Sequence, residues 1–170
     1  MPTCAGMTGE SPVERQAWLY RELYGLPCRV SGIRITLSTS DVCAIMAPCA
    51  LAALVDDELF WSKKVTPILS DGTGSPTLIL LAAPTSLDLT PCATALRRRA
   101  QCEFLPPGRQ ITLPVPRLSA TSPAPSAPLA SADPAPHWFR YPQWESPQPL
   151  TAVLRAIRIV LRDLPRTYPT

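Results

Sequence analysis

The sequence predicts an α+β fold: a small mixed or antiparallel sheet with helices packed on it. Three observations lead to this fold class. The hydrophobic period is three to four residues near the N-terminus and two after Ile33, apolar runs are joined by polar turns that contain Gly, and a strongly amphipathic segment lies near the C-terminus. With 170 residues, of which 46% are hydrophobic, the chain fits one modest domain plus unpacked segments.

The N-terminal elements follow from capping and periodicity. Residues 1–10 show no periodicity, so we expect a flexible N-terminus. Ser11-Pro12-Val13-Glu14 has the pattern of a capping box, which predicts a helix that ends near Gly25. Apolar side chains alternate with Arg34, Thr36 and Ser38 after Ile33, which predicts a strand with one polar face.

Two apolar stretches follow. Residues 42–47 are apolar throughout and predict a strand buried on both faces, although a buried helix has the same pattern. The Ala- and Leu-rich stretch 49–59 predicts a helix with Pro48 near its first turn. We expect the acidic run Asp56-Asp57-Glu58 near its end to face solvent.

Turn residues organise the rest of the body, which we place at residues 11–118. The runs 65–69 and 77–82 flank a Gly-bearing turn and predict a hairpin. Thr90-Pro91 opens a predicted helix that reaches Ala100. Two short strands are then predicted around a Pro-Pro-Gly turn, at residues 103–105 and 110–113.

The composition changes sharply after the body. Residues 119–136 are almost entirely Ala, Ser and Pro, which predicts a linker or long loop with polyproline character. Residues 137–164 contain an aromatic stretch and then an amphipathic helix from about Leu150, and we expect this segment to return and complete the same domain. Residues 165–170 form a tail.

The charge is unevenly distributed. Residues 1–149 hold 12 Lys and Arg against 12 Asp and Glu, whereas residues 150–170 hold four Arg and one Asp, so the net charge of +3 arises in the last 21 residues. This balance permits nucleic-acid binding but is weaker than the strongly basic character typical of such proteins. The longest run without a charged or strongly polar side chain, residues 42–55, is too short to span a bilayer, and no signal peptide is recognisable. We therefore expect a cytoplasmic protein with no membrane partner.

The thiols and the single histidine give no metal or catalytic pattern. The six cysteines contain no C-x-x-C pair, and His137 is the only histidine that could join them. Most of the cysteines lie in apolar segments, so we expect buried thiols rather than disulfides or zinc ligands. We predict no cofactor, no metal site and no catalytic residue.

Two groups of residues are candidates for binding. Arg155, Arg158 and Arg162 share one face of the predicted C-terminal helix and could contact the phosphates of DNA or RNA, as could the run Arg97-Arg98-Arg99. A solvated basic face on a docked helix, and charge stabilisation at a helix C-terminus, are the competing interpretations. Trp138 and Trp144 are candidate partner-binding residues, although residues 137–140 also suit a strand that fastens the chain to the core.

The order of elements resembles the N-terminal domain of bifunctional DNA primase/polymerase (prim-pol) proteins. The resemblance rests on a buried strand ending in Ala47-Pro48, a hairpin around residues 71–74, a Pro107-Gly108 turn before Ile111-Thr112-Leu113-Pro114, and a strand containing Trp138 before a final helix. It covers roughly residues 30–162. The resemblance implies an α+β core with a mixed sheet, two metal-binding aspartates on the strand matched by residues 42–46, and a histidine after the Gly-containing turn.

The chain departs from that family where the chemistry would lie. Residues 42–46 read Val-Cys-Ala-Ile-Met with only Asp41 at the edge, and Ser75-Pro76-Thr77 stands where a Gly-Gly-x-His segment would be expected. Two-metal nucleotidyl transfer needs converging carboxylates to hold the ions. The resemblance therefore implies a catalytically degenerate member.

Three functional hypotheses follow. The first is a non-catalytic prim-pol-like accessory protein associated with nucleic acid. The second is a protein-interaction module that uses the Pro-rich segment and the terminal amphipathic helix. The third, an active primase or nucleotidyltransferase, requires convergence among four aspartates, which are Asp41, Asp56, Asp57 and Asp88.

Overall fold

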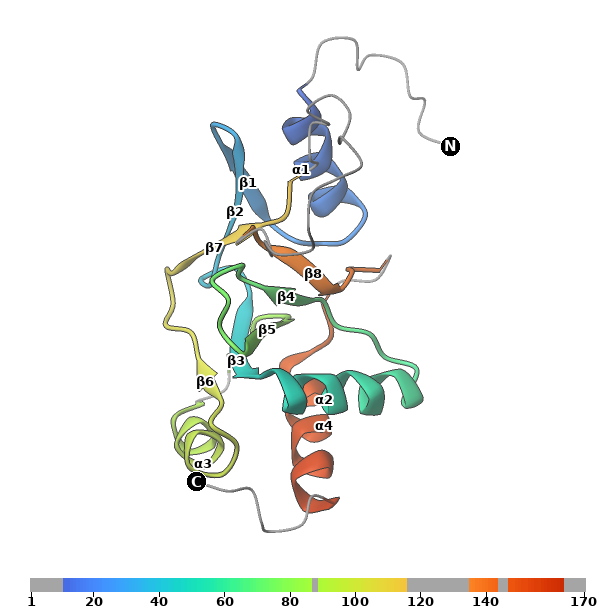
Figure 1. The fold of residues 1–170 in the computed structure, drawn as a ribbon, viewed down its shortest axis with the longest axis vertical. Coiled ribbons are helices and arrows are strands. Elements are labelled where there is room, and N and C mark those ends of the chain that lie inside the picture. Colours follow the sequence, from blue (N-terminus) through green and yellow to red (C-terminus); the bar gives the residue numbers. More distant parts are fainter. Residues whose placement is uncertain (1–10, 87–88, 116–134, 144–146, 164–170) are drawn as a thin grey trace, which may run out of the picture.

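Two antiparallel sheets and four helices make up the part of the chain that the computed structural model describes, which is residues 11–86, 89–115, 135–143 and 147–163 (Figure 1). The three-stranded sheet has the order β1-β2-β7, and the five-stranded sheet has the order β6-β3-β5-β4-β8. The predicted α+β class is confirmed, with antiparallel pairing throughout both sheets.

The bounds of the elements agree closely with the sequence pattern. The helices are α1 (Pro12–Glu22), α2 (Cys49–Trp61), α3 (Thr90–Ala100) and α4 (Leu150–Asp163). The three-stranded sheet contains β1 (Cys28–Ser31), β2 (Arg34–Ser38) and β7 (Gln110–Leu113). The five-stranded sheet contains β6 (Glu103–Phe104), β3 (Cys43–Pro48), β5 (Thr77–Ala82), β4 (Ile68–Ser70) and β8 (His137–Arg140).

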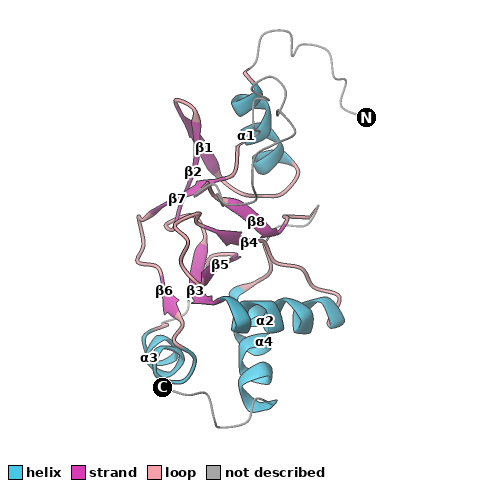
Figure 2. Ribbon diagram, in the orientation of Figure 1, coloured by secondary structure: helices cyan, strands magenta, loops and turns pink. Residues whose placement is uncertain are grey.

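The five-stranded sheet is the middle layer of the molecule. Along β5, Leu80 packs with residues of α2, α3 and α4, whereas Leu81 packs with α1 and the three-stranded sheet. The same alternation along β3 places Ile45 in the first cluster and Ala44 in the second. Successive side chains of a strand point to opposite faces, so both faces of this sheet are buried, as predicted for residues 42–47. Figure 2 shows α2, α3 and α4 grouped at one end of the long axis and α1 at the other.

The predicted starts and stops of the first helix are confirmed. The Ser11 hydroxyl accepts a hydrogen bond from the backbone N–H of Glu14, and the Glu14 carboxylate accepts one from the Ser11 N–H. Gly25 has a φ of 60°, the left-handed conformation that glycine adopts without steric cost after a helix. The chain then turns into β1.

Two predictions need correction. Ile33 does not begin a strand: it lies in the two-residue turn of a hairpin between β1 and β2 and is 80% exposed, because Gly32 supplies the positive φ that such a turn requires. Asp56 does not face solvent but is 4% exposed, since it has an ion-pair partner. The two strands predicted around the Pro-Pro-Gly turn are present, at residues 103–104 and 110–113, and they join different sheets, so this turn connects the two sheets.

The C-terminal segment is part of the same packing. β8 pairs with β4, and α4 shares a core cluster with α2. The predicted flexible residues 1–10, the linker up to residue 134 and the tail at 165–170 lie outside the described residues.

Candidate functional site

A β-bulge at Phe139 lets β8 contact both faces of the five-stranded sheet. Ile68 is opposite Arg140 and Leu69 is opposite Trp138. One step along β4 therefore matches two steps along β8, and Phe139 is the extra residue. Arg140 therefore reaches α2, where its Nε donates to Oδ1 and Oδ2 of Asp56 at 2.9 Å and its Nη2 donates to Oδ2. This fork-shaped pairing fixes the end of β8 against the helical layer.

Trp138, the predicted partner-binding residue, is engaged inside the protein. Its Nε1 donates to the Tyr20 hydroxyl at 2.9 Å, and that hydroxyl donates to the Pro114 carbonyl at 2.9 Å. The two rings meet edge to face with centroids 5.8 Å apart. Burial raises the pKa of the Tyr20 phenol, so it remains a donor. Trp138 thus fastens β8 to α1, as the anchoring interpretation predicted, and Trp144 lies outside the described residues.

The most exposed aromatic side chains among the described residues lie elsewhere. Phe60 and Trp61, at the end of α2, are 60% and 81% exposed, and their rings are 6.2 Å apart. In the sequence, the only signal for this pair was two adjacent aromatic residues just after the predicted helix 49–59, and that pattern does not distinguish buried from exposed positions.

The C-terminal helix separates apolar and basic faces as predicted. Val153 and Ile157 are fully buried in the core, whereas Arg155, Arg158 and Arg162 are exposed on the opposite side. Arg162 forms a surface ion pair with Asp163, in which Nε and Oδ1 are 2.9 Å apart, and the hydrogen bond lowers the pKa of Asp163. Arg155 and Arg158 have no ion pair with any described residue and are free to contact a ligand.

The second arginine group lies at the same end of the molecule. In α3, Leu96 and Ala100 are buried and Arg97, Arg98 and Arg99 are exposed in the last turn. Their positive charge interacts favourably with the negative end of the helix dipole. Figure 1 shows α3 and α4 both below the sheets, so the two basic groups lie at the same end of the molecule.

The four aspartates weighed for catalysis do not form a common site in the described structure. Asp56 is bound to Arg140 on the helical side of the five-stranded sheet, and its neighbour Asp57 is exposed. Asp41 lines a cavity beside the three-stranded sheet. Asp88 lies outside the described residues, and no three His, Cys, Asp or Glu side chains among the described residues form a metal-binding group.

The described cysteines are free thiols that fall into three burial classes. Cys28 and Cys102 are buried, and burial raises the pKa of both thiols, that of Cys102 to about 11. Cys43 and Cys92 are partly buried. Cys49 is exposed at the start of α2, which corrects the prediction of burial for that residue. Cys4 lies outside the described residues.

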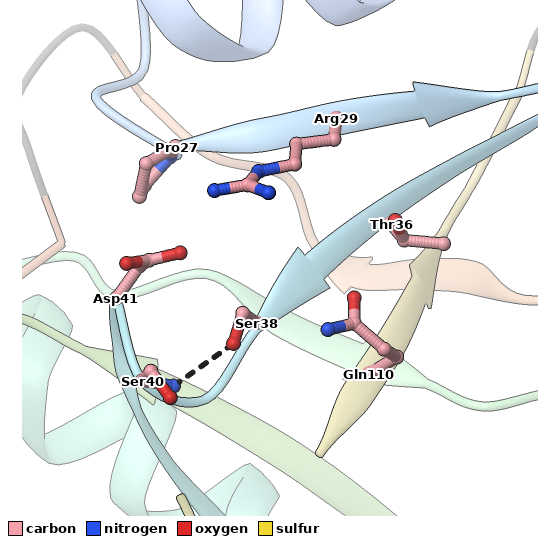
Figure 3. Close-up of a pocket in the computed structure, with 7 residues that line it drawn as sticks. All are labelled: Pro27, Arg29, Thr36, Ser38, Ser40, Asp41 and Gln110. Atoms are coloured by element: carbon pink, nitrogen blue, oxygen red, sulfur yellow. Dashed lines mark hydrogen bonds between the residues drawn. The ribbon is translucent and has the colours of Figure 1, made fainter. Parts of the chain in front are cut away.

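A polar cavity of about 260 Å³ lies on the outer face of the three-stranded sheet. Arg29 pairs with Thr36 and Ser38 pairs with Gln110 across the three strands, so these side chains share a face. Its wall beyond the strands consists of three residues, which are Pro27, Ser40 and Asp41. Figure 3 shows the Arg29 guanidinium and the Asp41 carboxylate pointing toward one another across the cavity.

Sequence reasoning missed this cavity. The alternation of Arg34, Thr36 and Ser38 with apolar residues did indicate a polar strand face. It could not indicate that β1 and β7 flank that strand and add Arg29 and Gln110 to the same face, because strand order depends on contacts far apart in sequence.

Comparison with known proteins gave no significant match for this chain, whether to a family model, a curated protein or a solved structure. No helix in the described ranges is long and apolar enough to cross a membrane.

Proposed function

We propose that the protein is a non-catalytic accessory protein that associates with nucleic acid and is related to the prim-pol N-terminal domain. The observation that carries the proposal is the exposed basic face of α4. Arg155 and Arg158 project from a helix whose opposite face is fixed in the core, so their backbone positions are rigid while their guanidinium groups are free of ion pairs with described residues. Rigid arginines of this kind suit contact with phosphate groups.

Two further features support the proposal. Arg97, Arg98 and Arg99 add exposed positive charge on α3, at the same end of the molecule. The element order from β3 through the β4 and β5 hairpin to β8 and α4 is the order on which the prim-pol resemblance rests. The non-catalytic part rests on the residues themselves: β3 carries Cys43-Ala44-Ile45-Met46 in place of an aspartate pair, and Asp56 is bound to Arg140.

The test is a fluorescence-anisotropy titration with labelled single- and double-stranded DNA at low and moderate salt. We expect binding that weakens steeply with salt, because phosphate contacts release condensed counterions. The variant Arg155→Glu/Arg158→Glu should bind at least about tenfold more weakly and lower the salt slope by about 2.

The matched control is Arg15→Glu/Arg34→Glu. It makes the same change in net charge at exposed arginines of α1 and β2, away from α3 and α4. It should retain most of the affinity. Absence of salt-sensitive binding by the native chain would refute the proposed function, and equal losses in both variants would refute the α4 surface as the binding site.

A further inference from the structure

The cavity on the three-stranded sheet places two exposed opposite charges, Arg29 and Asp41, among polar side chains. We infer that it binds a small zwitterion of the free α-amino-acid type, with the carboxylate of the ligand on Arg29 and its ammonium group on Asp41. This inference does not rest on the proposed function, because the cavity lies on the three-stranded sheet and the basic faces lie on α3 and α4.

The charges of the cavity select for a ligand that carries both signs. Arg29 and Asp41 face one another, yet no ion pair within 4.0 Å joins them. The two charges cancel, so the cavity has no net attraction for a polyanion. A guanidinium binds a carboxylate through two parallel hydrogen bonds, and a carboxylate accepts hydrogen bonds from an ammonium group. One molecule that carries both groups can satisfy both side chains at once.

The wall that carries Asp41 is held in place by hydrogen bonds. The Asp41 N–H donates to the Ser38 carbonyl at 3.0 Å, and the Ser40 N–H donates to the Ser38 hydroxyl at 3.2 Å. Between them, the buried Thr39 hydroxyl donates to the Pro106 carbonyl and accepts from the Arg109 N–H at 2.9 Å. The turn from β2 to β3 is therefore tied to the turn before β7, and a preorganised wall loses less entropy when a ligand binds.

The size and lining of the cavity limit the ligand further. Its volume of about 260 Å³ is below the roughly 300–1,000 Å³ of pockets for drug-sized ligands. Among the described residues, Pro27 is the one apolar residue that lines the cavity, and none of them adds an aromatic ring on which a base or a sugar could stack. Thr36, Ser38 and Gln110 offer hydroxyl and amide groups to a small polar side chain.

The test is a two-dimensional ¹H–¹⁵N NMR titration of the full chain with L-serine. Two half-ligands separate the contributions: N-acetylserine keeps the carboxylate without the ammonium charge, and serinamide keeps the ammonium group without the carboxylate. We expect saturable shifts of the amides of Arg29, Thr36 and Gln110 with serine, and at least about tenfold weaker binding of each half-ligand.

Variants test the two charged contacts directly. Arg29→Gln and Asp41→Asn should each weaken serine binding about tenfold, because each removes a charge-assisted contact while keeping a side chain of similar size. Arg34→Gln is the control, since Arg34 is exposed on the same sheet but does not line the cavity.

The half-ligand comparison uses the native chain, so it holds even if a variant folds poorly. Shifts that increase without saturation, shifts spread over the surface, or equal binding of serine and one half-ligand would overturn the inference. Loss of binding to DNA would not affect it, because the two sites share no residue.

Discussion

The two sheets of this protein differ in how many of their faces are buried. The five-stranded sheet has apolar side chains on both faces, so consecutive residues such as Leu80 and Leu81 are both fully buried. The three-stranded sheet is buried on one face only, so Leu37 is fully buried while its neighbour Thr36 lines the polar cavity. One sheet is the buried middle layer, and the other has a solvated polar face.

This difference follows from what covers each face. Helices α2, α3 and α4 cover one side of the five-stranded sheet, and α1 with the three-stranded sheet covers the other. No described element covers the outer face of the three-stranded sheet in the region of the cavity. An antiparallel sheet tolerates one solvated face, and that face can change in sequence with little loss of stability.

Four single substitutions test this difference in burial between the two sheets, and they have the largest expected effects on stability. Leu80→Ala and Leu81→Ala should each lower the free energy of unfolding by about 2–5 kcal/mol, because each leaves a cavity in a different core cluster. Leu37→Ala should cost a similar amount, whereas Thr36→Ala should stay within about 0.5 kcal/mol. Chemical denaturation followed by circular dichroism measures all four. A small effect at either Leu80 or Leu81 would contradict burial on both faces.

The next effect concerns the ion pair that joins β8 to the helical layer. Asp56→Asn should lower the free energy of unfolding by about 2 kcal/mol, below the roughly 3–5 kcal/mol for a fully buried pair, because the Arg140 side chain is 37% exposed. Asp57→Asn, at the exposed neighbouring position, should stay within about 0.5 kcal/mol. Chemical-denaturation midpoints distinguish the two variants. Equal midpoints would mean that the Asp56–Arg140 ion pair makes no net contribution to the free energy of unfolding.

Local signals in the sequence were sufficient for most of the fold. The capping box at Ser11, the apolar run of β3 and the amphipathic pattern of α4 each act within one element, and each prediction is confirmed. Asp56 was predicted wrongly because its partner Arg140 is 84 residues away. Ile33 was predicted wrongly because Gly32 places it in a turn, which interrupts an otherwise continuous alternation.

The candidate sites show the same difference between signals within one element and contacts between residues far apart in sequence. The exposure of Arg155 and Arg158 could be predicted from helical periodicity alone. The cavity could not, since it needs Arg29 from β1, Asp41 from the next turn and Gln110 from β7 on one face. The sequence also could not show which residue Trp138 contacts. An aromatic residue after a Pro-rich segment gives no indication that the Tyr20 hydroxyl accepts its N–H.

The smallest expected effect tests the contact between α1, β7 and β8, which holds the two sheets together at one edge. Tyr20→Phe should lower the free energy of unfolding at neutral pH by about 1 kcal/mol, because it leaves the Trp138 N–H and the Pro114 carbonyl without their partner. Tyr24→Phe, which removes a less buried phenol from the same aromatic cluster, is the control and should have a smaller effect.

The pH dependence separates this hydrogen bond from a packing defect. Burial raises the pKa of Tyr20 above its ordinary value of about 10, so the folded state retains the phenol proton that the unfolded state releases. The Tyr20 hydroxyl therefore makes its full contribution to the free energy of unfolding below about pH 10, and this contribution is lost as the pH rises above that value. The difference in unfolding free energy between the native chain and Tyr20→Phe should therefore narrow between pH 7 and about pH 11. A difference that stays constant across this range would show that ring packing, and not the protonated hydroxyl, joins the two sheets here.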